Sequence, residues 1–285
     1  MIARQTPTNA LSVDVEDWFQ VGAFETVISR GDWDGLEHRV EANTDKVLAL
    51  FDDGGVKATF FTLGWVAQRY PALMRRIADA GHEVASHGWD HARVFTLTPA
   101  QFSADIDRAR AVLEDASGRQ VTGYRAPSFS IDKRTPWAHE ILAERGYAYS
   151  SSVAPIGHDH YGWADAPRAA FKPVAGAELI ELPVTTGKFL GREVTTGGGF
   201  FRLLPGGVIH RAMDELNRAG RPGVFYFHPW EVDPGQPRVA GAPLKSKLRH
   251  YARLGAMAGK LRTLMARHRW DRTDRVVARL RERMA

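Results

Sequence analysis

Three carboxylates lie close together near the start of the chain. Asp14, Glu16 and Asp17 follow an apolar run that contains Leu11 and Val13. Carboxylates this close to an apolar segment are costly to bury unless a cation neutralises them. If the segment is a strand, its alternation places Asp14 and Glu16 on the same face. These residues are therefore the first candidates for metal binding or acid–base chemistry, although a solvated strand end would also accommodate them.

Two histidines four positions apart form a second candidate group. His87 and His91 stand in the segment Ser86–His91, directly after a short apolar run. Imidazoles at this spacing converge on one metal ion when the segment turns. The chain contains no cysteine, so a metal must be held by His, Asp or Glu. Two histidines and a carboxylate are a known ligand set for a catalytic metal with open positions.

An arginine and a third histidine also follow apolar runs. Arg125 ends the run Val121–Arg125 and can hold a carboxylate with two hydrogen bonds. His228 leaves the run Phe225–Phe227 and precedes Pro229, a position well suited to a proton donor. A surface arginine and a structural histidine are the plainer interpretations of these two residues.

The elements that must position these residues alternate between strands and helices. The sequence predicts strands at Ala10–Glu16, Lys57–Leu63, Glu83–Ser86, Val121–Arg125, Tyr147–Ser151, Leu179–Val184 and Val224–His228. Amphipathic helices are predicted between them, with starts at Asn43, Pro71, the capping box Thr98–Gln101, and Thr135–Pro136. This alternation favours an α/β fold with a parallel sheet, either a barrel or an open sheet. In such folds the polar residues just past the strand ends build the site.

The last part of the chain differs in charge from the rest. Residues 245–285 contain 13 Lys/Arg and 3 Asp/Glu, a net charge of +10, whereas the remainder has 25 basic and 30 acidic residues, a net charge of −5. We therefore divide the chain into a catalytic domain, residues 1–234, and a basic helical C-terminal extension packed on it, residues 235–285. Such a segment suits an anionic partner, for example an anionic membrane surface, but also an ordinary solvated helix face. No nucleic-acid partner is expected.

No segment of the sequence predicts export or membrane insertion. The N-terminal stretch Met1–Asn9 is polar, and the longest apolar stretch, Ala58–Ala67, is too short to span a bilayer. We expect a cytoplasmic protein, with the inner membrane face as the place where the basic extension would make contact. A chain from which a signal segment had been removed would have the same sequence pattern.

Four segments, taken in order, resemble the motifs of one enzyme family. The likeness extends from about Ala10 to Trp230, and its order and spacing are similar to those of the polysaccharide deacetylases with a nodulation-factor deacetylase homology domain, carbohydrate esterase family four. The opening DVEDWFQ, the ending HPWE and the tail around Arg249–Tyr251 further resemble a subgroup associated with exosortase-linked exopolysaccharide clusters. The four segments are SVDVED (Ser12–Asp17), SHGWDH (Ser86–His91), YRAP (Tyr124–Pro127) and YFHP (Tyr226–Pro229).

The resemblance implies a fold, a cofactor and a reaction. The fold would be a distorted (β/α) barrel of parallel strands with outer helices. The cofactor would be one divalent metal ion, usually Zn²⁺, held by His87, His91 and Glu16 or Asp17. The protein would remove N-acetyl groups from an N-acetylated polysaccharide or oligosaccharide, which a lipid could carry, in exopolysaccharide biosynthesis.

The resemblance also implies roles for the other motif residues. Asp14 would be the general base, Arg125 its partner, and His228 the general acid. Core packing explains the aromatic residues near the motifs as well as sugar binding does. The residues expected to contact substrate are Trp18, Trp89, Pro127, Phe129 and Trp230.

Two departures from the family pattern leave questions open. Many members have adjacent aspartates in the first motif, whereas Val15 follows Asp14 here, so the choice between Glu16 and Asp17 as the metal ligand stays open. The usual Asp-Ser-Ser after a later strand reads Ser150–Ser152 here, which changes the local support of the site. Two other functions also remain: an amidase acting on a small non-sugar C–N bond, and a catalytically silent carbohydrate-binding relative.

Overall fold

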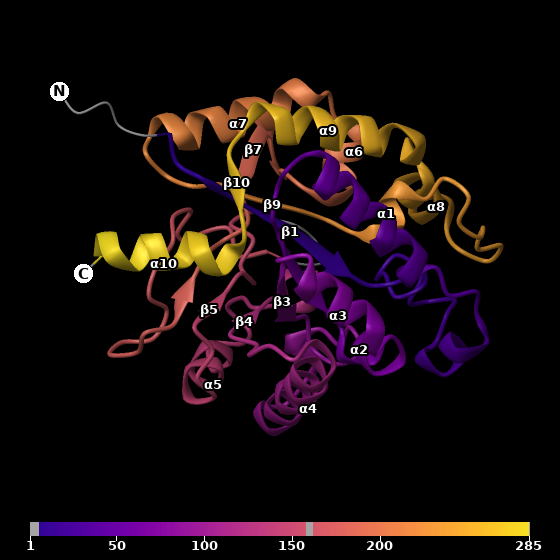
Figure 1. Ribbon diagram of the computed structural model, residues 1–285, viewed down its shortest axis with the longest axis horizontal. Helices are drawn as coiled ribbons and strands as arrows, with labels where there is room; N and C mark the ends of the chain where they lie inside the picture. The colour runs from indigo at the N-terminus through magenta and orange to yellow at the C-terminus, as the bar shows by residue number, and fades with distance from the viewer. Residues whose placement is uncertain (1–5, 158–161, 285) are drawn as a thin grey trace.

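One curved sheet of eight parallel strands forms the centre of the molecule (Figure 1). The computed structural model describes residues 6–157 and 162–284, so most of the N-terminal stretch Met1–Asn9 lies outside the described residues. Most of the strands lie within the predicted ones and are shorter at their ends. They are β1 (Asn9–Val15), β2 (Thr59–Thr62), β3 (Glu83–Ser86), β4 (Gly123–Tyr124), β5 (Tyr149–Ser150), β6 (Ile180–Glu181), β9 (Val224–Phe227) and β10 (Trp270–Asp271).

The order of the strands makes this sheet an incomplete barrel. β1 has β2 and β10 along one side and β9 along the other, and the sheet continues from β2 through β3, β4 and β5 to β6. The chain after β6 returns to β9, where the Thr185 N–H donates to the Val224 carbonyl at 3.4 Å and the Val224 N–H donates to Thr185 Oγ1 at 2.7 Å. These bonds bring the two open edges together. The predicted distorted (β/α) barrel is therefore confirmed.

Helices surround the outside of the barrel (Figure 1). They are α1 (Val40–Asp53), α2 (Gly64–Arg69), α3 (Pro71–Asp79), α4 (Pro99–Ser117), α5 (Ala138–Glu144), α6 (Gly198–Leu203), α7 (Gly206–Arg218), α8 (Leu244–Tyr251), α9 (Met257–Arg267) and α10 (Thr273–Met284). Short 3₁₀ helices cover Arg30–Gly35, Val94–Thr96, Pro127–Phe129, Pro229–Val232 and Leu254–Ala256. Within residues 6–157 and 162–284, no helix is long and apolar enough to cross a bilayer.

The local sequence signals predicted one helix start and missed a hairpin and two helices. α4 begins with the predicted capping box, in which the Gln101 N–H donates to Thr98 Oγ1 at 3.2 Å and the Thr98 N–H donates to Gln101 Oε1 at 2.8 Å. The antiparallel hairpin of β7 (Thr186–Phe189) and β8 (Arg192–Thr195) was not predicted, and neither were α6 and α7.

The start of α1 is set by a residue far away in the sequence. The prediction that Asn43 caps this helix is wrong, because the helix begins at Val40. The N–H groups of Arg39 and Val40 donate to Asp17 Oδ2 at 2.7 and 3.0 Å. A carboxylate that accepts these otherwise unpaired N–H groups does the work of a cap. The cap is supplied by the loop after β1, so the two elements are locked together.

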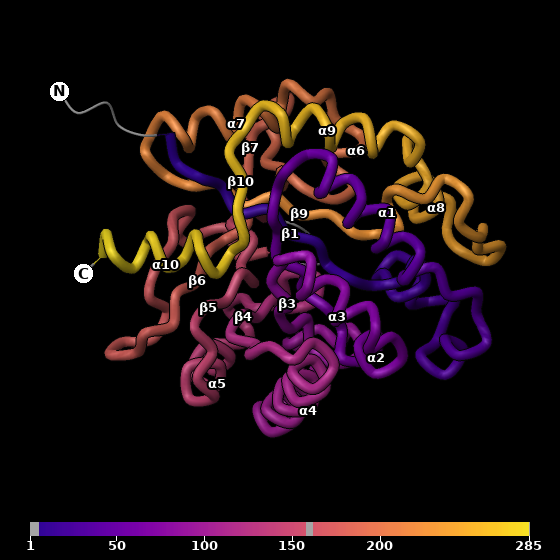
Figure 2. The backbone as a smooth tube through the Cα atoms, in the orientation of Figure 1, coloured from indigo at the N-terminus to yellow at the C-terminus, as the bar shows by residue number. Residues whose placement is uncertain are grey.

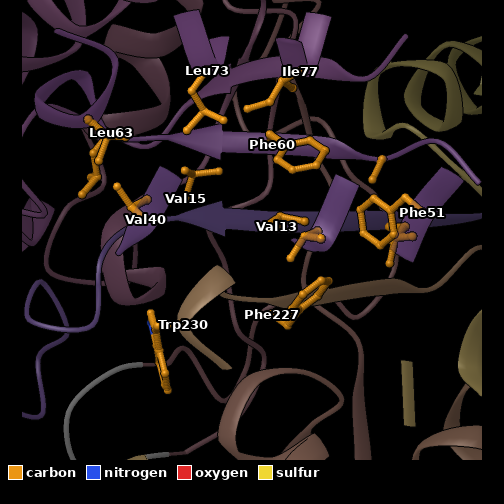
Figure 3. Packing of buried hydrophobic residues seen from close by; sticks show 14 of the residues in the cluster. Val13, Val15, Val40, Phe51, Phe60, Leu63, Leu73, Ile77, Phe227 and Trp230 are labelled. Atoms are coloured by element: carbon orange, nitrogen blue, oxygen red, sulfur yellow. The ribbon is translucent and has the colours of Figure 1, made fainter. Parts of the chain in front are cut away.

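The alternation along β1 separates the outer core from the barrel interior. Val13 and Val15 point outward, and Asp14 points into the barrel toward Arg125. Figure 3 shows the outward side chains packed between β1, β2, β9 and the covering helices. Burial of each such side chain contributes roughly 1.5–3 kcal/mol relative to leaving it exposed. Their fully buried neighbours include Phe51, Phe60, Leu73, Ile77 and Phe227.

The C-terminal region is mostly helical but also joins the main sheet. β10 pairs with Asn9 and Ala10 of β1, and Figure 2 shows this yellow part of the chain crossing beside the indigo N-terminal strand. At the start of α10, the Thr273 N–H donates to Thr59 Oγ1 at 2.7 Å. The sequence predicted only helices here and missed the strand. The division of the chain at residue 234 stays a prediction.

Candidate functional site

The C-terminal ends of the barrel strands meet at one cleft. Asp14 and Glu16 lie at the end of β1, His87 follows β3, Arg125 follows β4 and His228 follows β9. All of these except the arginine line the cleft, whose volume is about 460 Å³. A cleft of this size lies within the range of small-ligand sites. The structure therefore brings the polar residues of four separate strand ends to one place.

Glu16, His87 and His91 form a group that can hold a metal ion. One ligand atom from each lies within 4.8 Å of the others. His87 Nδ1 is 2.8 Å from the Arg125 carbonyl, which only accepts hydrogen bonds. Nδ1 therefore carries the proton, and Nε2 is left for a metal ligand bond. His91 Nε2 lies 2.9 Å from Glu16 Oε2.

This donor set fits a divalent cation of the zinc type. Glu16 Oε2 is buried and has no aligned hydrogen-bond partner among the described residues, although His91 is close to it. Burial would raise the pKa of Glu16, but His91 and His228 lower it to about 2. Burial lowers the pKa of His87 to about 4, so this imidazole is neutral. An ionised carboxylate with an unpaired oxygen beside a neutral imidazole suits a bound Zn²⁺.

The loop that carries His91 is held by two neighbouring helices. The Trp89 N–H donates to both carboxylate oxygens of Asp105 on α4, at 3.1 and 3.2 Å. The Gly64 N–H at the start of α2 donates to the carbonyl before Trp89 at 2.9 Å. Gly64 has no room for a side chain, since a Cβ there would lie 2.5 Å from the Trp89 ring. These contacts stabilise His91 at a φ of 61°, a region that side-chain-bearing residues rarely adopt.

Asp14 is oriented by a fully buried arginine. Arg125 Nη1 donates to Asp14 Oδ1 at 2.6 Å and to Ser12 Oγ at 2.8 Å. Its Nε and Nη2 donate to the carbonyl and the hydroxyl of Ser151, both at 3.1 Å. The serine segment that replaces the usual Asp-Ser-Ser thus supports the site through this arginine. Asp14 itself lines the cleft and keeps a fixed direction.

His228 is oriented by a buried pair of opposite charges. Its Nδ1 lies 2.8 Å from Glu231 Oε1, and Glu231 Oε2 accepts from Arg202 Nε at 2.5 Å. Its Nε2 lies 3.6 Å from Glu16 Oε1. Burial would lower the pKa of His228, but Glu16 and Glu231 raise it to about 9. The imidazole is therefore positively charged at neutral pH and can donate a proton in the cleft.

The C-terminal extension builds one wall of the same cleft. His250 stacks on Trp230 with ring centroids 4.2 Å apart, and Trp230 stacks on His228 with centroids 5.1 Å apart. The residues of the extension that line the cleft are Pro243, Lys245, Ser246, Arg249 and His250. The Arg202 guanidinium joins this wall to the surroundings of His228, because it also donates to the carbonyls of Arg249, His250 and Ala252, at 3.1, 2.7 and 2.8 Å.

Asp17 serves the backbone and does not join the metal group. Its Oδ2 accepts from the N–H groups of Arg39 and Val40, and its Oδ1 accepts from the Trp18 N–H at 2.8 Å. Both oxygens are thus engaged, mainly at the start of α1. Of the two alternatives, the structure brings Glu16 to the histidines and leaves Asp17 as a distant cap.

Two of the five expected substrate-contact residues line the cleft. They are Phe129 and Trp230. Trp18 is buried and donates its indole N–H to a backbone carbonyl, and Trp89 lies beneath an arginine of α4. Pro127 is buried at the start of a 3₁₀ helix. These three residues pack in the core and do not face the cleft. Residue type alone could not predict this, because it does not determine the direction of a side chain at the end of a strand or in a loop.

Sequence reasoning missed the supports of His228 and the outer wall of the cleft. Glu231 follows His228 by three positions, and this spacing was the one available signal for the pair. Arg202 lies in a segment for which no element was predicted. Lys245 and Arg249 were assigned to a separate extension, because a basic helix has the same pattern whether or not it borders a cleft.

Two family models match the chain one after the other. Residues 33–150 match the polysaccharide deacetylase family, and residues 151–278 match a domain of unknown function, DUF3473. The first range contains His87, His91 and Arg125. The second contains His228 and Glu231. The cleft is therefore assembled from both ranges and from β1, which precedes them.

Named relatives are similar to part of the chain. A peptidoglycan deacetylase of Helicobacter pylori is 31% identical over 126 residues, and a chitin deacetylase of a Pestalotiopsis species is 35% identical over 123 residues. The two matches cover 44% and 42% of this chain, and 40% of each relative. This chain thus spans about two fifths of the length of these relatives.

Solved structures match over nearly all of the chain. A protein assigned as a polysaccharide deacetylase from Mycobacterium smegmatis has a TM-score of 0.64 at 20% identity, covering 100% of this chain and 93% of that one. An allantoinase has a TM-score of 0.63 at 14% identity, covering 98% of this chain and 91% of that one. At these identities the likeness shows the fold alone. The family match shows that the chain contains a polysaccharide deacetylase domain over residues 33–150, and the solved structures show the fold to which this domain belongs.

Proposed function

We propose that this protein is a metal-dependent hydrolase that removes N-acetyl groups from an N-acetylated polysaccharide or oligosaccharide. One observation carries the proposal: a single cleft holds a metal-ligand group, a carboxylate fixed by an arginine, and a positively charged histidine. Amide hydrolysis needs these three components, because a water must be deprotonated, a carbonyl activated and an amine protonated as it leaves. The names of the relatives, peptidoglycan deacetylase and chitin deacetylase, support an N-acetylated glycan as the substrate.

Glu16, His87 and His91 would hold the metal, and we expect Zn²⁺. A bound ion of this kind would act as a Lewis acid on the acetyl carbonyl. The chain offers three side-chain ligands, so a bound ion would keep room for a water or for the substrate.

Asp14 is proposed to act as the general base. It accepts a proton from the water whose oxygen attacks the acetyl carbon, and Arg125 keeps its carboxylate in one direction. His228 is proposed to act as the general acid. As the C–N bond breaks, His228 gives its proton to the departing nitrogen, so that acetate and a free amine are the products. Glu231 stabilises the charged form that this step requires.

Acetate release decides between this function and its two rivals. Zinc-loaded protein is incubated with chitotetraose, and the products are followed by mass spectrometry and by acetate detection. Loss of acetyl groups supports the proposal. Ammonia release from small amides, without acetate release from sugars, would instead show an amidase acting on a small non-sugar C–N bond. Binding of chitotetraose without metal-dependent turnover would show a catalytically silent carbohydrate-binding relative.

The place of action is proposed from the resemblance and from α8. We infer that the glycan belongs to exopolysaccharide biosynthesis and is carried by a lipid, so that the protein contacts an anionic membrane. Leu244 and Leu248 on α8 are 72% and 63% exposed and lie one turn apart. Between Asp233 and Asp271 the sequence has nine Lys/Arg and no acidic residue, which suits anionic headgroups. The expected cytoplasmic location stays a prediction.

Vesicle flotation tests the membrane contact separately from catalysis. The protein should float with phosphatidylglycerol vesicles at low salt and less at high salt, since exposed charges are screened. The double variant Leu244→Ser/Leu248→Ser should lose flotation and keep its activity on soluble chitotetraose, because neither leucine lines the cleft. Flotation of the double variant at the level of the unmodified protein would contradict α8 as the contact.

A further inference from the structure

Two cations of α8 border the cleft in which the acetyl group would be cleaved. Lys245 and Arg249 lie one helical turn apart, and both line the cleft together with His228 and Glu16. Leu244 and Leu248 do not line it. The helix thus turns Lys245 and Arg249 toward the cleft and its leucines away from it, so the two faces can have different partners.

Within the described residues, the other positively charged side chains of the cleft are paired with carboxylates of the protein, whereas these two are not. Neither the Lys245 nor the Arg249 side chain has a hydrogen-bond or ion-pair partner among residues 6–157 and 162–284. The matched groups are Arg93 with Glu25 at 2.7 Å, Arg202 with Glu231 at 2.5 Å, Arg125 with Asp14 at 2.6 Å and His228 with Glu231 at 2.8 Å. The outer wall therefore carries two uncompensated positive charges.

These charges have a fixed place relative to the reacting groups. Arg202 holds three carbonyls at the end of α8, including that of Arg249, and its other side is bonded to Glu231. The same carboxylate orients His228. Residues 234–270 contain no Asp or Glu that could neutralise this wall from within the extension. A low-dielectric cleft with one sign of charge at its edge concentrates ligands of the opposite sign.

We propose that Lys245 and Arg249 bind an anionic group on a sugar next to the one that is deacetylated. The substrate would then be an acidic N-acetylated glycan, in which the anionic group is a carboxylate of a uronate or a phosphate. This inference rests on the proposed function and adds to it the chemical class of the substrate. Arginine suits such a group because its planar guanidinium matches the geometry of carboxylate and phosphate oxygens.

The proposal is tested by binding, with substrates that differ only in charge. Zinc-loaded Asp14→Asn protein, which is expected to bind without turnover, is titrated with hyaluronan tetrasaccharide and with its carboxyl methyl ester. The acid should bind about fivefold more tightly than the ester at low salt, the size expected for two partly exposed ion pairs. High salt should remove the difference. His228→Gln protein replaces Asp14→Asn if the latter does not fold.

A second variant pair assigns the preference to the two cations. Lys245→Gln/Arg249→Gln in the same background should bind the acid and the ester equally. The control Arg262→Gln/Arg269→Gln removes the same charge from exposed positions of the same extension that do not line the cleft. It should keep the full preference. An equal loss of the preference in the control would overturn the proposal. So would a parent protein that prefers neither the acid over the ester nor a diphosphate-bearing sugar over its neutral counterpart.

The source of the anion is distinguished by a further arm. UDP-N-acetylglucosamine carries a diphosphate and no carboxylate, and N-acetylglucosamine is its neutral counterpart. Preference for the diphosphate alone assigns a phosphate, and preference for the tetrasaccharide alone assigns a uronate. Acetate release from chitotetraose by the unmodified protein is measured in parallel. If acetate release fails while the preference for the charged ligand persists, the proposed reaction is wrong and the anion site stands. If acetate is released but no charge preference is found, the reaction stands and the anion site is wrong.

Discussion

Arg125 Nη1 lies 2.6 Å from Asp14 Oδ1, and the two side chains are buried at the C-terminal end of the barrel. The arginine also bonds Ser12 and Ser151, so its position is set by β1 and by the segment after β5. The carboxylate is thus held by one arginine and is not among the ligand atoms grouped with His87 and His91. This separation of the aspartate from the metal group is what a general base requires, because a base must keep an oxygen available for a proton.

Asp14→Asn should keep the metal and lose catalysis. An amide oxygen can still accept a bond from Arg125, but it cannot take a proton from water at neutral pH. Removing a general base typically lowers kcat on the order of 10²–10⁴-fold. Zinc content by elemental analysis and acetate release from chitotetraose measure the two effects separately. Loss of zinc in this variant, with zinc retained in Glu16→Gln, would reverse the assignment of the two residues.

Glu16→Gln and Asp17→Asn should differ in metal affinity and in stability. Glu16 lies with the two histidines, so its amide variant should weaken zinc binding sharply. Asp17 accepts three backbone N–H groups, so its variant should keep zinc but unfold at a lower temperature. Loss of a helix cap typically costs about 0.5–2 kcal/mol. Zinc titration and thermal unfolding of both variants check this, and equal zinc affinities in the two would contradict it.

His87→Ala and His91→Ala should each remove most of the bound zinc and nearly all activity. Each deletes one of three ligands, and the chain has no cysteine that could substitute. Zinc per protein is measured after dialysis against a weak chelator. The matched control is His82→Ala, a histidine that accepts from the backbone N–H of Ala58 and is not among the residues that line the cleft. Full zinc occupancy in both cleft variants would place the metal elsewhere.

Much of the barrel and of the inner site follows from the sequence. The run from Asn9 to Val15 alternates, and the parallel order of the strands brings their ends together, so Asp14, Glu16, His87 and His228 could be grouped in advance. The two candidate ligands at 16 and 17 could not be separated from sequence. The chain turns after Val15, and this turn places the Asp17 carboxylate at the start of α1. There it accepts from the N–H of Val40, which lies 23 residues later in the sequence. A long-range cap of this kind has no local signal.

The outer site could not be predicted for a different physical reason. Arg202 donates to backbone carbonyls at the end of α8. Every residue type has the same backbone carbonyl, so no residue pattern indicates these contacts. Trp89 and Trp230 are the same residue type, yet only Trp230 lines the cleft. The Trp89 indole instead packs against Gly64. β10 pairs through two residues, too few for a periodic pattern. These features depend on how distant segments meet, and local sequence does not encode that.

Glu231→Gln should lower kcat without a comparable change in KM. The carboxylate is bonded to His228 Nδ1 and to Arg202, and it lies behind the imidazole where substrate does not touch it. A neutral amide orients the ring less firmly and stabilises its charged form less, so we expect kcat to fall roughly 10–100-fold, as for other supporting groups. Steady-state kinetics on chitotetraose separate the two constants. An unchanged kcat would mean that the pair only stabilises the fold, and a rise in KM alone would mean that Glu231 acts on binding.

Glu83, at the opposite end of the barrel, should make stability fall as pH rises. It is buried and accepts from Thr59 Oγ1 at 2.5 Å, Tyr149 Oη at 2.8 Å and the Asp274 N–H at 3.2 Å. Burial, with the nearby Asp274 carboxylate, raises its pKa from 4.5 to about 8.

The folded protein therefore keeps a proton on Glu83 that the unfolded chain has lost between pH 4.5 and about pH 8. The contribution is fully present below the lower value and is lost as pH rises through the upper one, with a slope of up to about 1.4 kcal/mol per pH unit. Glu83→Gln has no such proton, so its free energy of unfolding should fall less over this window. Urea unfolding of both proteins from pH 5 to pH 9 gives the difference. The difference between the unmodified protein and Glu83→Gln cancels the contributions of other titrating groups, such as Asp105, which both proteins contain. Parallel pH profiles would show that Glu83 is ionised in the folded protein, and that the hydrogen bonds of Thr59, Tyr149 and α10 stabilise its charge against burial.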